Sequence, residues 1–468
     1  MPIARTARRI ARSPLAVVGT AAALAVAWTF VWEAFWAPSP VAAEDGAEGA
    51  EAERSAQVAE SAAASALGQP GIVRRGPRLL QEPDPEVPGL PIAIEDRDGR
   101  SMEGLHAALR EAERGTGQAR LVFYGASHVA SDLFTGVIRH RLQERFGDAG
   151  HGMILPAHPW RTYRHLGARM QSNRRLWDSS KVRVNMRDPD FFGVAGTFVE
   201  SARQGAWGRV ATADRGPVGR TASRFDLYYL QRPEGGSFEV ALDGEVVRRV
   251  ETGRDDGYAP GYLTLDVPDA EHELEVRVEG DGPVRFFGVA MERDAPGVIV
   301  DTLGINGARA RYHLLWDDQL YREHLRRRQP NLVALAYGTN EAGDDVPIER
   351  YEQELRAVLG RIRETVPEAS CLLIGPSDRP VRRPDRSFED RPRTGQIIEV
   401  QHRVALEMGC GFFDLVAFSG GPLSMVEWAA MDPRYGQPDH VHYTRRGYHR
   451  LGEVLLDALL AGYDPDAE

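Results

Sequence analysis

The chain has 468 residues, which is enough for two ordinary domains and further segments. Its 57 basic and 68 acidic residues give a formal net charge of −11, and this charge argues against a nucleic-acid partner because it would repel phosphates. A content of 42% hydrophobic residues excludes a chain that is disordered throughout. Only two cysteines are present, which excludes a disulfide-dense scaffold and a cysteine-built metal site.

The N-terminus has the pattern of an export signal. Basic residues in the first twelve positions precede an apolar run over residues 15–36. The run approaches the length of a membrane-spanning helix, so we favour an uncleaved signal anchor over residues 1–36, with its arginines in the cytoplasm. A signal peptide that is removed near residues 41–43 is the alternative. Either way we expect an exported body, in the periplasm or cell envelope, anchored to the inner membrane or secreted.

Residues 37–93 are rich in Ala, Glu, Ser, Gly and Pro and show no sustained apolar period. This composition predicts a disordered tether. The folded part is expected from residue 94 onward, with a helix over 102–114, a buried strand over 121–124 and a helix over 133–146.

The pattern changes between about residues 150 and 296, where short alternating runs are separated by Gly, Pro and Asp. Such spacing predicts an all-β, jelly-roll-like sandwich domain over 151–296, with a hairpin turn at Asp243-Gly244. The predicted strands are 193–200, 207–213, 225–230, 237–242, 245–251, 262–267, 273–278 and 284–291.

After this insert, strands alternate with helices again, which predicts a mostly parallel sheet with helices on both faces. The α/β domain therefore comprises residues 94–150 and 297–468, interrupted by the β-sandwich. The predicted strands are 298–303, 332–337, 371–375 and 412–415, and the predicted helices are 314–327, 347–365, 395–408 and 444–460.

Both cysteines, Cys371 and Cys410, stand at the start of predicted strands that are candidates for neighbours in one sheet. One disulfide between them is an alternative that the spacing allows. We favour two buried free thiols.

Ser127 occupies the most informative position of the chain. The apolar run 121–124 ends at Gly125, and Ala126 and Ser127 follow before a helical pattern resumes at Leu133. Ser127 is therefore expected at the carboxyl end of a buried strand, the edge where open α/β sheets bind ligands. Its hydroxyl and backbone N–H would lie near a helix N-terminus, which favours a developing negative charge. A serine that only caps its helix is the alternative.

Two loops after other strands can converge on Ser127. Gly307 follows the strand 298–303, and its N–H can point into the site; an ordinary Asn-Gly turn is the alternative. Asn340 follows the strand 332–337, and its amide can stabilise an oxyanion; a helix cap is the alternative.

A third loop, just before the last helix, carries Asp439 and His442. At this spacing His442 can accept the proton of Ser127 while Asp439 holds the imidazole in position. His440 is an alternative base, but it is a poor partner for Asp439 because the two are adjacent. Alone, the Asp-x-x-His pattern also fits a metal fragment or a helix cap.

The order of these pieces resembles the SGNH (GDSL) hydrolase superfamily, whose four blocks supply Ser, Gly, Asn and His. Ala126 and His128 depart from the Asp and Leu usual in the first block, at positions that are not catalytic in the family. The matching segments are Gly125-Ala126-Ser127-His128, Gly307, Gly338-Thr339-Asn340 and Asp439-x-x-His442.

The resemblance implies a flavodoxin-like three-layer fold and a serine esterase without metal or organic cofactor. An inserted β domain after the first block is similar to bacterial peptidoglycan O-acetylesterases, in which the insert resembles a carbohydrate-binding module. The implied catalytic residues are Ser127, His442 and Asp439, and the implied oxyanion hole consists of Ser127, Gly307 and Asn340.

The predicted activity is therefore hydrolysis of O-acetyl esters on envelope carbohydrate, with peptidoglycan favoured, through an acetyl-enzyme. Alternatives are an O-acetyltransferase with the same residues, a lipase or lysophospholipase, and a non-enzymatic glycan-binding protein. One or two aromatic residues of the insert are expected to stack on sugars, while the others form its core. The candidates are Trp160, Trp177, Trp207, Tyr228, Tyr229, Phe286 and Phe287.

Overall fold

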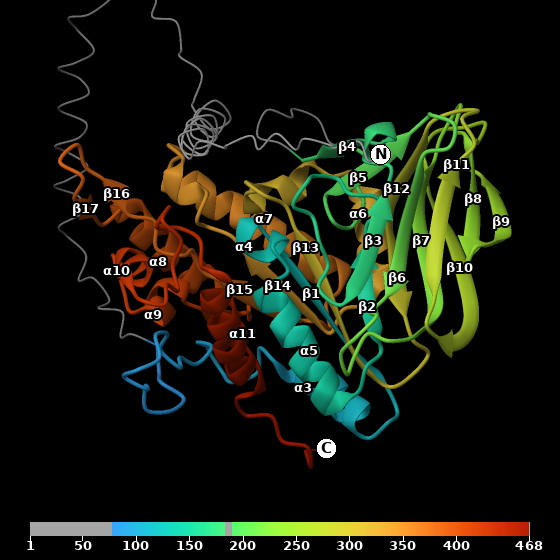
Figure 1. Cartoon of the computed structure of the whole chain (residues 1–468). Coiled ribbons are helices and arrows are strands. Elements are labelled where there is room, and N and C mark those ends of the chain that lie inside the picture. The colour runs from blue at the N-terminus through green and yellow to red at the C-terminus, as the bar shows by residue number, and fades with distance from the viewer. Residues whose placement is uncertain (1–76, 183–189, 468) are drawn as a thin grey trace, which may run out of the picture. The chain divides into compact units, whose positions relative to one another are not determined.

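The computed structural model describes residues 77–182 and 190–467 (Figure 1). These residues belong to one compact unit. The expected signal segment, 1–36, and most of the expected tether lie outside the described residues. Within the described part of the chain, no helix is both long enough and apolar enough to cross a membrane.

A parallel five-stranded sheet forms the centre of the α/β domain, in the order β13-β1-β14-β15-β18. Numbered along this domain, the order is 2-1-3-4-5, the flavodoxin-like arrangement. The predicted α/β class is therefore confirmed. The strands are β1 (Gln118–Gly125), β13 (Gly297–Gly304), β14 (Leu332–Ala336), β15 (Ser370–Ile374) and β18 (Gly411–Phe413).

Helices cover both faces of this sheet. The α-helices are α3 (Glu103–Glu113), α4 (Ser127–Ala130), α5 (Phe134–Phe146), α6 (Asp318–Arg328), α7 (Ile348–Thr365), α8 (Pro392–Glu407), α9 (Leu415–Ser419), α10 (Ser424–Ala430) and α11 (Arg445–Leu460). Short 3₁₀ helices span Arg174–Leu176, Ala310–Leu315 and Glu341–Gly343, and a two-stranded hairpin pairs β16 (Val381–Arg382) with β17 (Phe388–Glu389).

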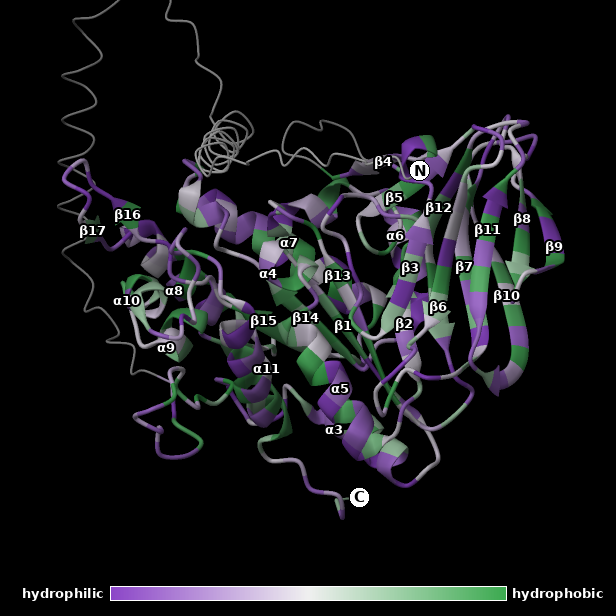
Figure 2. Ribbon diagram, in the orientation of Figure 1, coloured by the Kyte–Doolittle hydropathy of each residue, from purple (hydrophilic) through white to green (hydrophobic). Residues whose placement is uncertain are grey.

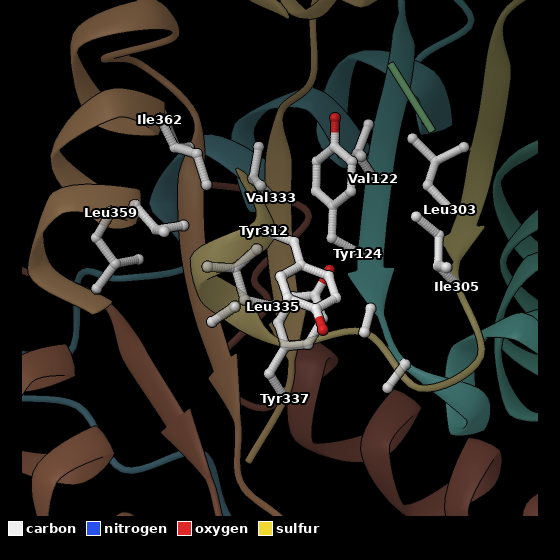
Figure 3. Packing of buried hydrophobic residues seen from close by; sticks show 14 of the residues in the cluster. Val122, Tyr124, Leu303, Ile305, Tyr312, Val333, Leu335, Tyr337, Leu359 and Ile362 are labelled. Carbon is white, nitrogen blue, oxygen red and sulfur yellow. The ribbon is translucent and has the colours of Figure 1, made fainter. Parts of the chain in front are cut away.

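Alternation along β1 decides which layer each side chain enters. Leu121 and Phe123 pack with the apolar sides of α3, α5 and α11. Val122 and Tyr124 enter the opposite layer, with α6, α7 and α8. Because both faces are covered, β14 is hydrophobic along its length and β1 is hydrophobic over residues 121–123, whereas α5 and α11 carry both colours (Figure 2). Figure 3 shows Val122, Tyr124, Val333, Leu335, Leu359 and Ile362 in this second layer.

The inserted β domain consists of two antiparallel sheets, which confirms the prediction of an all-β insert. One sheet has the order β10-β7-β12-β5-β4, with β2 pairing to β12, and the other has the order β3-β6-β11-β8-β9. The strands are β2 (Gly150–Ile154), β3 (Ala168–Ser172), β4 (Asp178–Lys181), β5 (Thr197–Ser201), β6 (Trp207–Thr212), β7 (Ala222–Gln231), β8 (Ser237–Leu242), β9 (Glu245–Glu251), β10 (Ala259–Ala270), β11 (Glu273–Val278) and β12 (Val284–Glu292).

The predicted Asp-Gly hairpin joins β8 to β9. Leu242 pairs with Glu245, so Asp243 and Gly244 form a two-residue turn. Both have positive φ, +51° and +88°, as the turn types that fit the strand twist require. The exact residues at which the insert begins and ends stay a prediction.

Buried contacts hold the insert against the α/β domain. Phe287 of β12 and Tyr228 of β7 belong to the same hydrophobic core as Val122 and Tyr124. The buried guanidinium of Arg328, on α6, lies 2.6 Å from a carboxylate oxygen of Glu292, on β12. The insert is therefore part of the folded body. Arg328 also pairs with Asp301, and Glu292 also pairs with Arg120, so these charges form one buried network.

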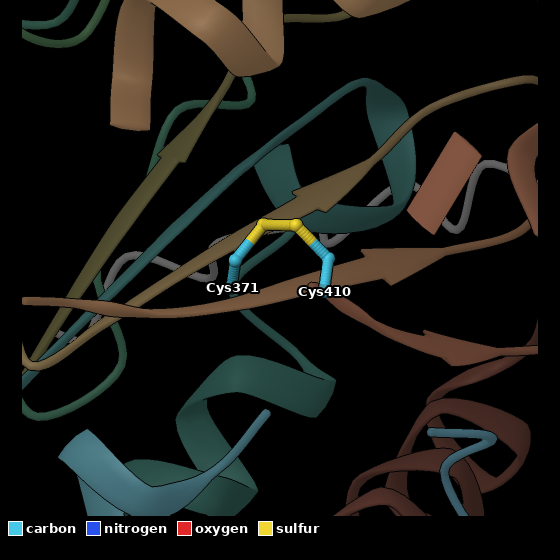
Figure 4. The surroundings of a disulfide bond; sticks show 2 residues. All are labelled: Cys371 and Cys410. Atoms are coloured by element: carbon cyan, nitrogen blue, oxygen red, sulfur yellow. A yellow bond between two sulfur atoms is a disulfide. The ribbon is translucent and has the colours of Figure 1, made fainter. Parts of the chain in front are cut away.

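The two cysteines form a disulfide, with a Cα–Cα distance of 4.6 Å (Figure 4). The expectation of two free thiols is wrong. The strands β15 and β18 are indeed neighbours, and Leu372 pairs with Gly411, so the register places Cys371 opposite Cys410. The sequence indicates neighbouring strands but does not give this register.

The expected tether is too long at its C-terminal end, because residues 77–93 pack on the α/β domain. Leu80 N–H donates to Pro91 O, and Leu90 N–H donates to Phe418 O. Ile92 is fully buried in the core below α3. The apolar residues of 77–93 are too few to give a period, but Leu80, Leu90 and Ile92 pack against the core of the α/β domain.

Candidate active site

The candidate residues gather where the strand order of the sheet reverses. In such sheets the crevice lies outside the carboxyl ends of the two strands that flank the reversal, here β1 and β14. Ser127 is the first residue of α4, directly after β1, and Asn340 follows β14. Gly307 lies in the loop after β13, while Asp439 and His442 lie in the loop before α11.

A close approach between α4 and β13 sets the position of Ser127. Gly125 pairs with Gly304 at the ends of the two strands. A Cβ on Gly304 would lie 2.1 Å from the backbone nitrogen of Ala130, so only glycine lets the one-turn helix pack there. Ser127 is thereby held at the start of α4, and its backbone N–H has no hydrogen-bond acceptor within the described part of the chain.

Ser127, His442 and Asp439 form a continuous hydrogen-bonded chain. His442 Nε2 lies 2.8 Å from Ser127 Oγ. Its Nδ1 lies 2.7 Å from Asp439 Oδ2. Because a carboxylate only accepts, we assign the imidazole proton to Nδ1, which leaves Nε2 to accept the serine proton. This is the geometry that an activated serine nucleophile requires.

Asp439 is held ionised by its own loop. Burial raises the pKa of its carboxyl, but hydrogen bonds from the His442 ring and from the N–H groups of His442 and Val441, with the nearby charge of His442, bring it down to about 2. Both N–H groups donate to Oδ1 at 3.0 Å. The carboxylate is therefore charged at any pH where the protein would act.

His440 does not take part in this chain. Its backbone lies in the left-handed region, at φ +57°, and its ring packs edge-on against Phe388 of the β16–β17 hairpin, 4.3 Å away. The interpretation that favoured His442 over His440 as the partner of Asp439 agrees with this geometry.

Asn340 and Gly307 lie in adjoining loops, as an oxyanion hole requires. Asn340 Nδ2 donates to Ala308 O at 2.9 Å, which uses one of its two amide hydrogens and leaves the other for a ligand. Gly307 has φ +79°, and its N–H has no acceptor among the described residues. The N–H groups of Ser127 and Gly307 and the Asn340 amide can therefore all donate to a developing negative charge.

Glu341, which the sequence analysis did not single out, joins these two loops. Its Oε1 accepts from Ala310 N–H at 2.8 Å, and its Oε2 accepts from Gly338 N–H at 3.0 Å. Burial raises the pKa of Glu341, although those N–H groups and Arg309 oppose the rise. In the sequence, the available signal was an acidic residue directly after Asn340, a candidate oxyanion residue.

His128 is the centre of a second buried network behind the site. Its Nδ1 lies 2.8 Å from Tyr448 Oη on α11, and its Nε2 lies 3.0 Å from Ser377 Oγ. Ser377 in turn contacts the hydroxyl of Thr339, 3.2 Å away. Burial and the nearby charge of His442 lower the pKa of His128 to about 3, so it stays neutral. The network links the Ser127 helix, the Asn340 loop and α11.

The site is open to solvent. The side chains of His442 and Asp439 are 32% and 39% exposed. An extended molecule can therefore reach Ser127 without first entering an enclosed cavity.

Comparisons with known proteins give a family match and similar solved structures. Residues 274–450 match the family model described as GDSL-like lipase/acylhydrolase family. A solved peptidoglycan O-acetylesterase is similar in structure at 26% sequence identity and a TM-score of 0.65, over 79% of this chain and 99% of that chain. No sequence among the curated proteins matches.

Two further solved structures align at low overall similarity. A salicylyl-acyltransferase from a tetracycline biosynthetic pathway is 16% identical, with a TM-score of 0.29, over 65% of this chain and 100% of that chain. A family two carbohydrate esterase from Clostridium thermocellum is 12% identical, with a TM-score of 0.26, over 57% of this chain and 95% of that chain. The matched family segment contains Gly307, Asn340, Asp439 and His442, and over this segment the chain is similar to the GDSL-like lipase/acylhydrolase (SGNH) family of esterase-type hydrolases.

Proposed function

We propose that this protein is an exported serine esterase that removes O-acetyl groups from cell-envelope carbohydrate, with peptidoglycan as its substrate. The observation that carries the proposal is the hydrogen-bonded chain Ser127–His442–Asp439 at the crevice of an SGNH fold. The similarity to a peptidoglycan O-acetylesterase over nearly that whole chain supports the choice of substrate.

In the first half of the proposed reaction, His442 Nε2 takes the hydroxyl proton of Ser127 as Oγ attacks the acetyl carbonyl carbon. The carbonyl oxygen becomes an oxyanion and accepts hydrogen bonds from the N–H groups of Ser127 and Gly307 and from the Asn340 amide. When the intermediate collapses, the bond from the carbonyl carbon to the sugar oxygen breaks. His442 returns its proton to that oxygen, so the sugar leaves as an alcohol and acetyl-Ser127 remains.

In the second half, water replaces the sugar. His442 takes one proton from the water as its oxygen attacks the acetyl carbon of acetyl-Ser127. Collapse of this intermediate releases acetate, and the proton on His442 returns to Ser127 Oγ. Asp439 stays ionised throughout and stabilises the imidazolium each time that it forms.

Two features support an envelope polymer as the substrate. The side chains of His442 and Asp439 are partly exposed, so a bulky glycan can approach the reacting serine. The Cys371–Cys410 disulfide fits an oxidising compartment outside the cytoplasm. We further propose that residues 1–36 direct the export and that residues 37–76 connect this segment to the folded body.

The test is acetate release from O-acetylated peptidoglycan by the wild-type protein and by Ser127→Ala. We expect release by the wild type and a loss of at least about a thousandfold in Ser127→Ala, because the oxyanion donors alone leave only residual catalysis. Ser387→Ala, at an exposed serine whose hydroxyl donates to Asp385 Oδ1, is the matched control and should keep full activity. Equal release by Ser127→Ala would contradict the mechanism, and acetyl transfer to an added glycan without acetate release would contradict hydrolysis.

A further inference from the structure

A segment of the insert runs beside the candidate active site. Residues 158–166, here called the rim segment, connect β2 to β3. At its start, Ser179 Oγ donates to Pro159 O at 2.6 Å. At its end, Leu166 N–H donates to the buried carboxylate of Asp132, two residues after α4 ends. The rim segment is therefore fixed both to the insert and to the α/β domain next to the Ser127 helix.

The first part of the rim segment carries Trp160, close to the oxyanion loop. Lys181 Nζ lies 5.7 Å from the centre of the Trp160 ring. The same ammonium donates to Asn306 O at 2.9 Å, and Asn306 directly precedes Gly307. The indole packs edge-on against Tyr163, with 5.4 Å between ring centres, so its orientation is fixed while it stays only partly buried.

Among the aromatic candidates of the insert, Trp160 alone combines exposure with a link to the site. Trp207 is also partly exposed, but it lies on β6, in the sheet that contributes nothing to the core shared with the α/β domain. The guanidinium of Arg209 lies 4.7 Å from its ring centre. The other candidates are buried, as core residues are: Trp177, Tyr228, Tyr229, Phe286 and Phe287.

The rim segment also carries positive charge in an acidic chain. Arg161 and Arg164 are exposed, and neither forms an ion pair with any described residue. Arg164 lies two residues before Leu166, whose backbone N–H donates to Asp132 just after α4. The segment thus reaches from the oxyanion loop, beside Trp160, toward the Ser127 helix, beside Arg164.

We propose that the rim segment is a substrate subsite for a carboxylate-bearing glycan, in which a sugar ring stacks on Trp160 and a carboxylate pairs with Arg161 and Arg164. The indole offers a flat apolar face to the C–H groups of a sugar, and guanidinium groups match carboxylates in geometry and charge. Peptidoglycan supplies both partners, through its sugar rings and the carboxylates of its peptide stems. This inference deepens the proposed function and rests on it.

Binding to the rim segment can be measured without ester cleavage. The first experiment therefore uses the Ser127→Ala protein and intact peptidoglycan in a co-sedimentation assay. Adding Trp160→Ala, or Arg161→Ala with Arg164→Ala, should weaken binding about tenfold, as expected for loss of one stacking contact or one charged contact. Trp207→Ala is the matched control and should bind as before. Salt should weaken binding of the parent protein more than that of the double arginine variant, because screening acts on exposed charges.

Kinetics in the active protein provide the second readout. We expect Trp160→Ala to raise KM for O-acetylated peptidoglycan about tenfold, while kcat/KM for p-nitrophenyl acetate, which carries no sugar, changes less than twofold. Unchanged binding and unchanged KM for peptidoglycan would overturn the subsite, as would an equal loss on p-nitrophenyl acetate. Failure of the wild type to release acetate from peptidoglycan would instead overturn the proposed function. The binding assay does not depend on catalysis, so it tests the subsite independently of that outcome.

Discussion

The side chain of Asp439 makes three hydrogen bonds within its own loop, and each of them fixes the neighbouring imidazole. Two come from the backbone, at Val441 and His442, and the third comes from the His442 ring. An amide in place of the carboxylate would keep the size of the side chain but would offer an N–H or an uncharged oxygen to Nδ1. The imidazole would then lose both its fixed tautomer and its counter-charge.

We therefore predict that Asp439→Asn lowers kcat for p-nitrophenyl acetate by about 10³ to 10⁴, with little change in KM. Steady-state kinetics check this prediction, with thermal unfolding as the test that the fold is intact. Asp385→Asn, on the exposed hairpin, is the matched control. A kcat within a factor of ten of the wild type would show that Asp439 does not orient the base.

His128 gives a prediction about stability at the same scale. His128→Leu introduces the residue usual in related enzymes and leaves the hydroxyls of Ser377 and Tyr448 without this buried partner. We expect the free energy of unfolding to fall by about 1–3 kcal/mol, the cost of leaving buried polar groups unsatisfied. Urea unfolding measures it, and equal or greater stability would mean that the network contributes no net stabilisation.

Strands and helices with a regular hydrophobic period could be predicted from the sequence, whereas short elements could not. The strands β6, β8, β9, β11 and β12 and helices such as α7 and α11 follow the predicted ranges closely, because alternation and helical spacing extend over many residues. By contrast, β5 begins later than predicted, and β7 and β10 are longer. The strands β3 and β4 have only five and four residues, rich in polar side chains, and α4 is a single turn. Their conformations come from tertiary contacts, such as the packing of α4 on Gly304.

The candidate catalytic residues could be predicted from the sequence, but the residues that hold their loops in place could not. Ser127, Asn340 and His442 each follow a strand or precede a helix in a recognisable pattern, and the structure brings them to one crevice. Their catalytic roles stay predictions. Glu341 and Ser377 act between loops that are distant in the sequence, so no local pattern indicates their partners.

The disulfide joins two neighbouring strands, β15 and β18, and should stabilise the fold. Cys371 and Cys410 close a loop over a separation of 39 residues. Loop-closure entropy gives an expected stabilisation of about 4 kcal/mol for a loop of this length. The double variant Cys371→Ala, Cys410→Ala should lose about this free energy of unfolding in urea, and the reduced wild type should behave alike. A stability equal to that of the oxidised wild type would contradict a formed disulfide.

Within the described part of the chain, burial keeps five histidines in the neutral state. Burial is the first cause in each case, and it lowers the pKa below the ordinary value of 6.5. The pKa is lowered to about 3 for His128, His165, His313 and His324, and to about 4 for His151. Because these groups bind protons in the unfolded chain at a pH where the folded chain does not, acid favours unfolding.

We predict that stability falls as the pH falls from 7.5 to 5.5. Well above pH 6.5 both states hold these histidines neutral. Below it the unfolded state gains protons, and each histidine lowers the free energy of unfolding by about 1.4 kcal/mol at pH 5.5. Urea unfolding across this range should show a loss of several kcal/mol and an uptake of several protons. A constant free energy of unfolding would contradict the burial of these neutral rings.

The most direct test of the proposed mechanism is to trap the acetyl-enzyme. The purified protein is mixed with an excess of p-nitrophenyl acetate, quenched in acid within milliseconds, and analysed by intact-protein and peptide mass spectrometry. We predict one acetyl group per chain, located on Ser127 and absent from Ser127→Ala. Acetylation at another residue, or turnover with no acetyl group on Ser127 at any quench time, would contradict the assignment of Ser127 as the nucleophile.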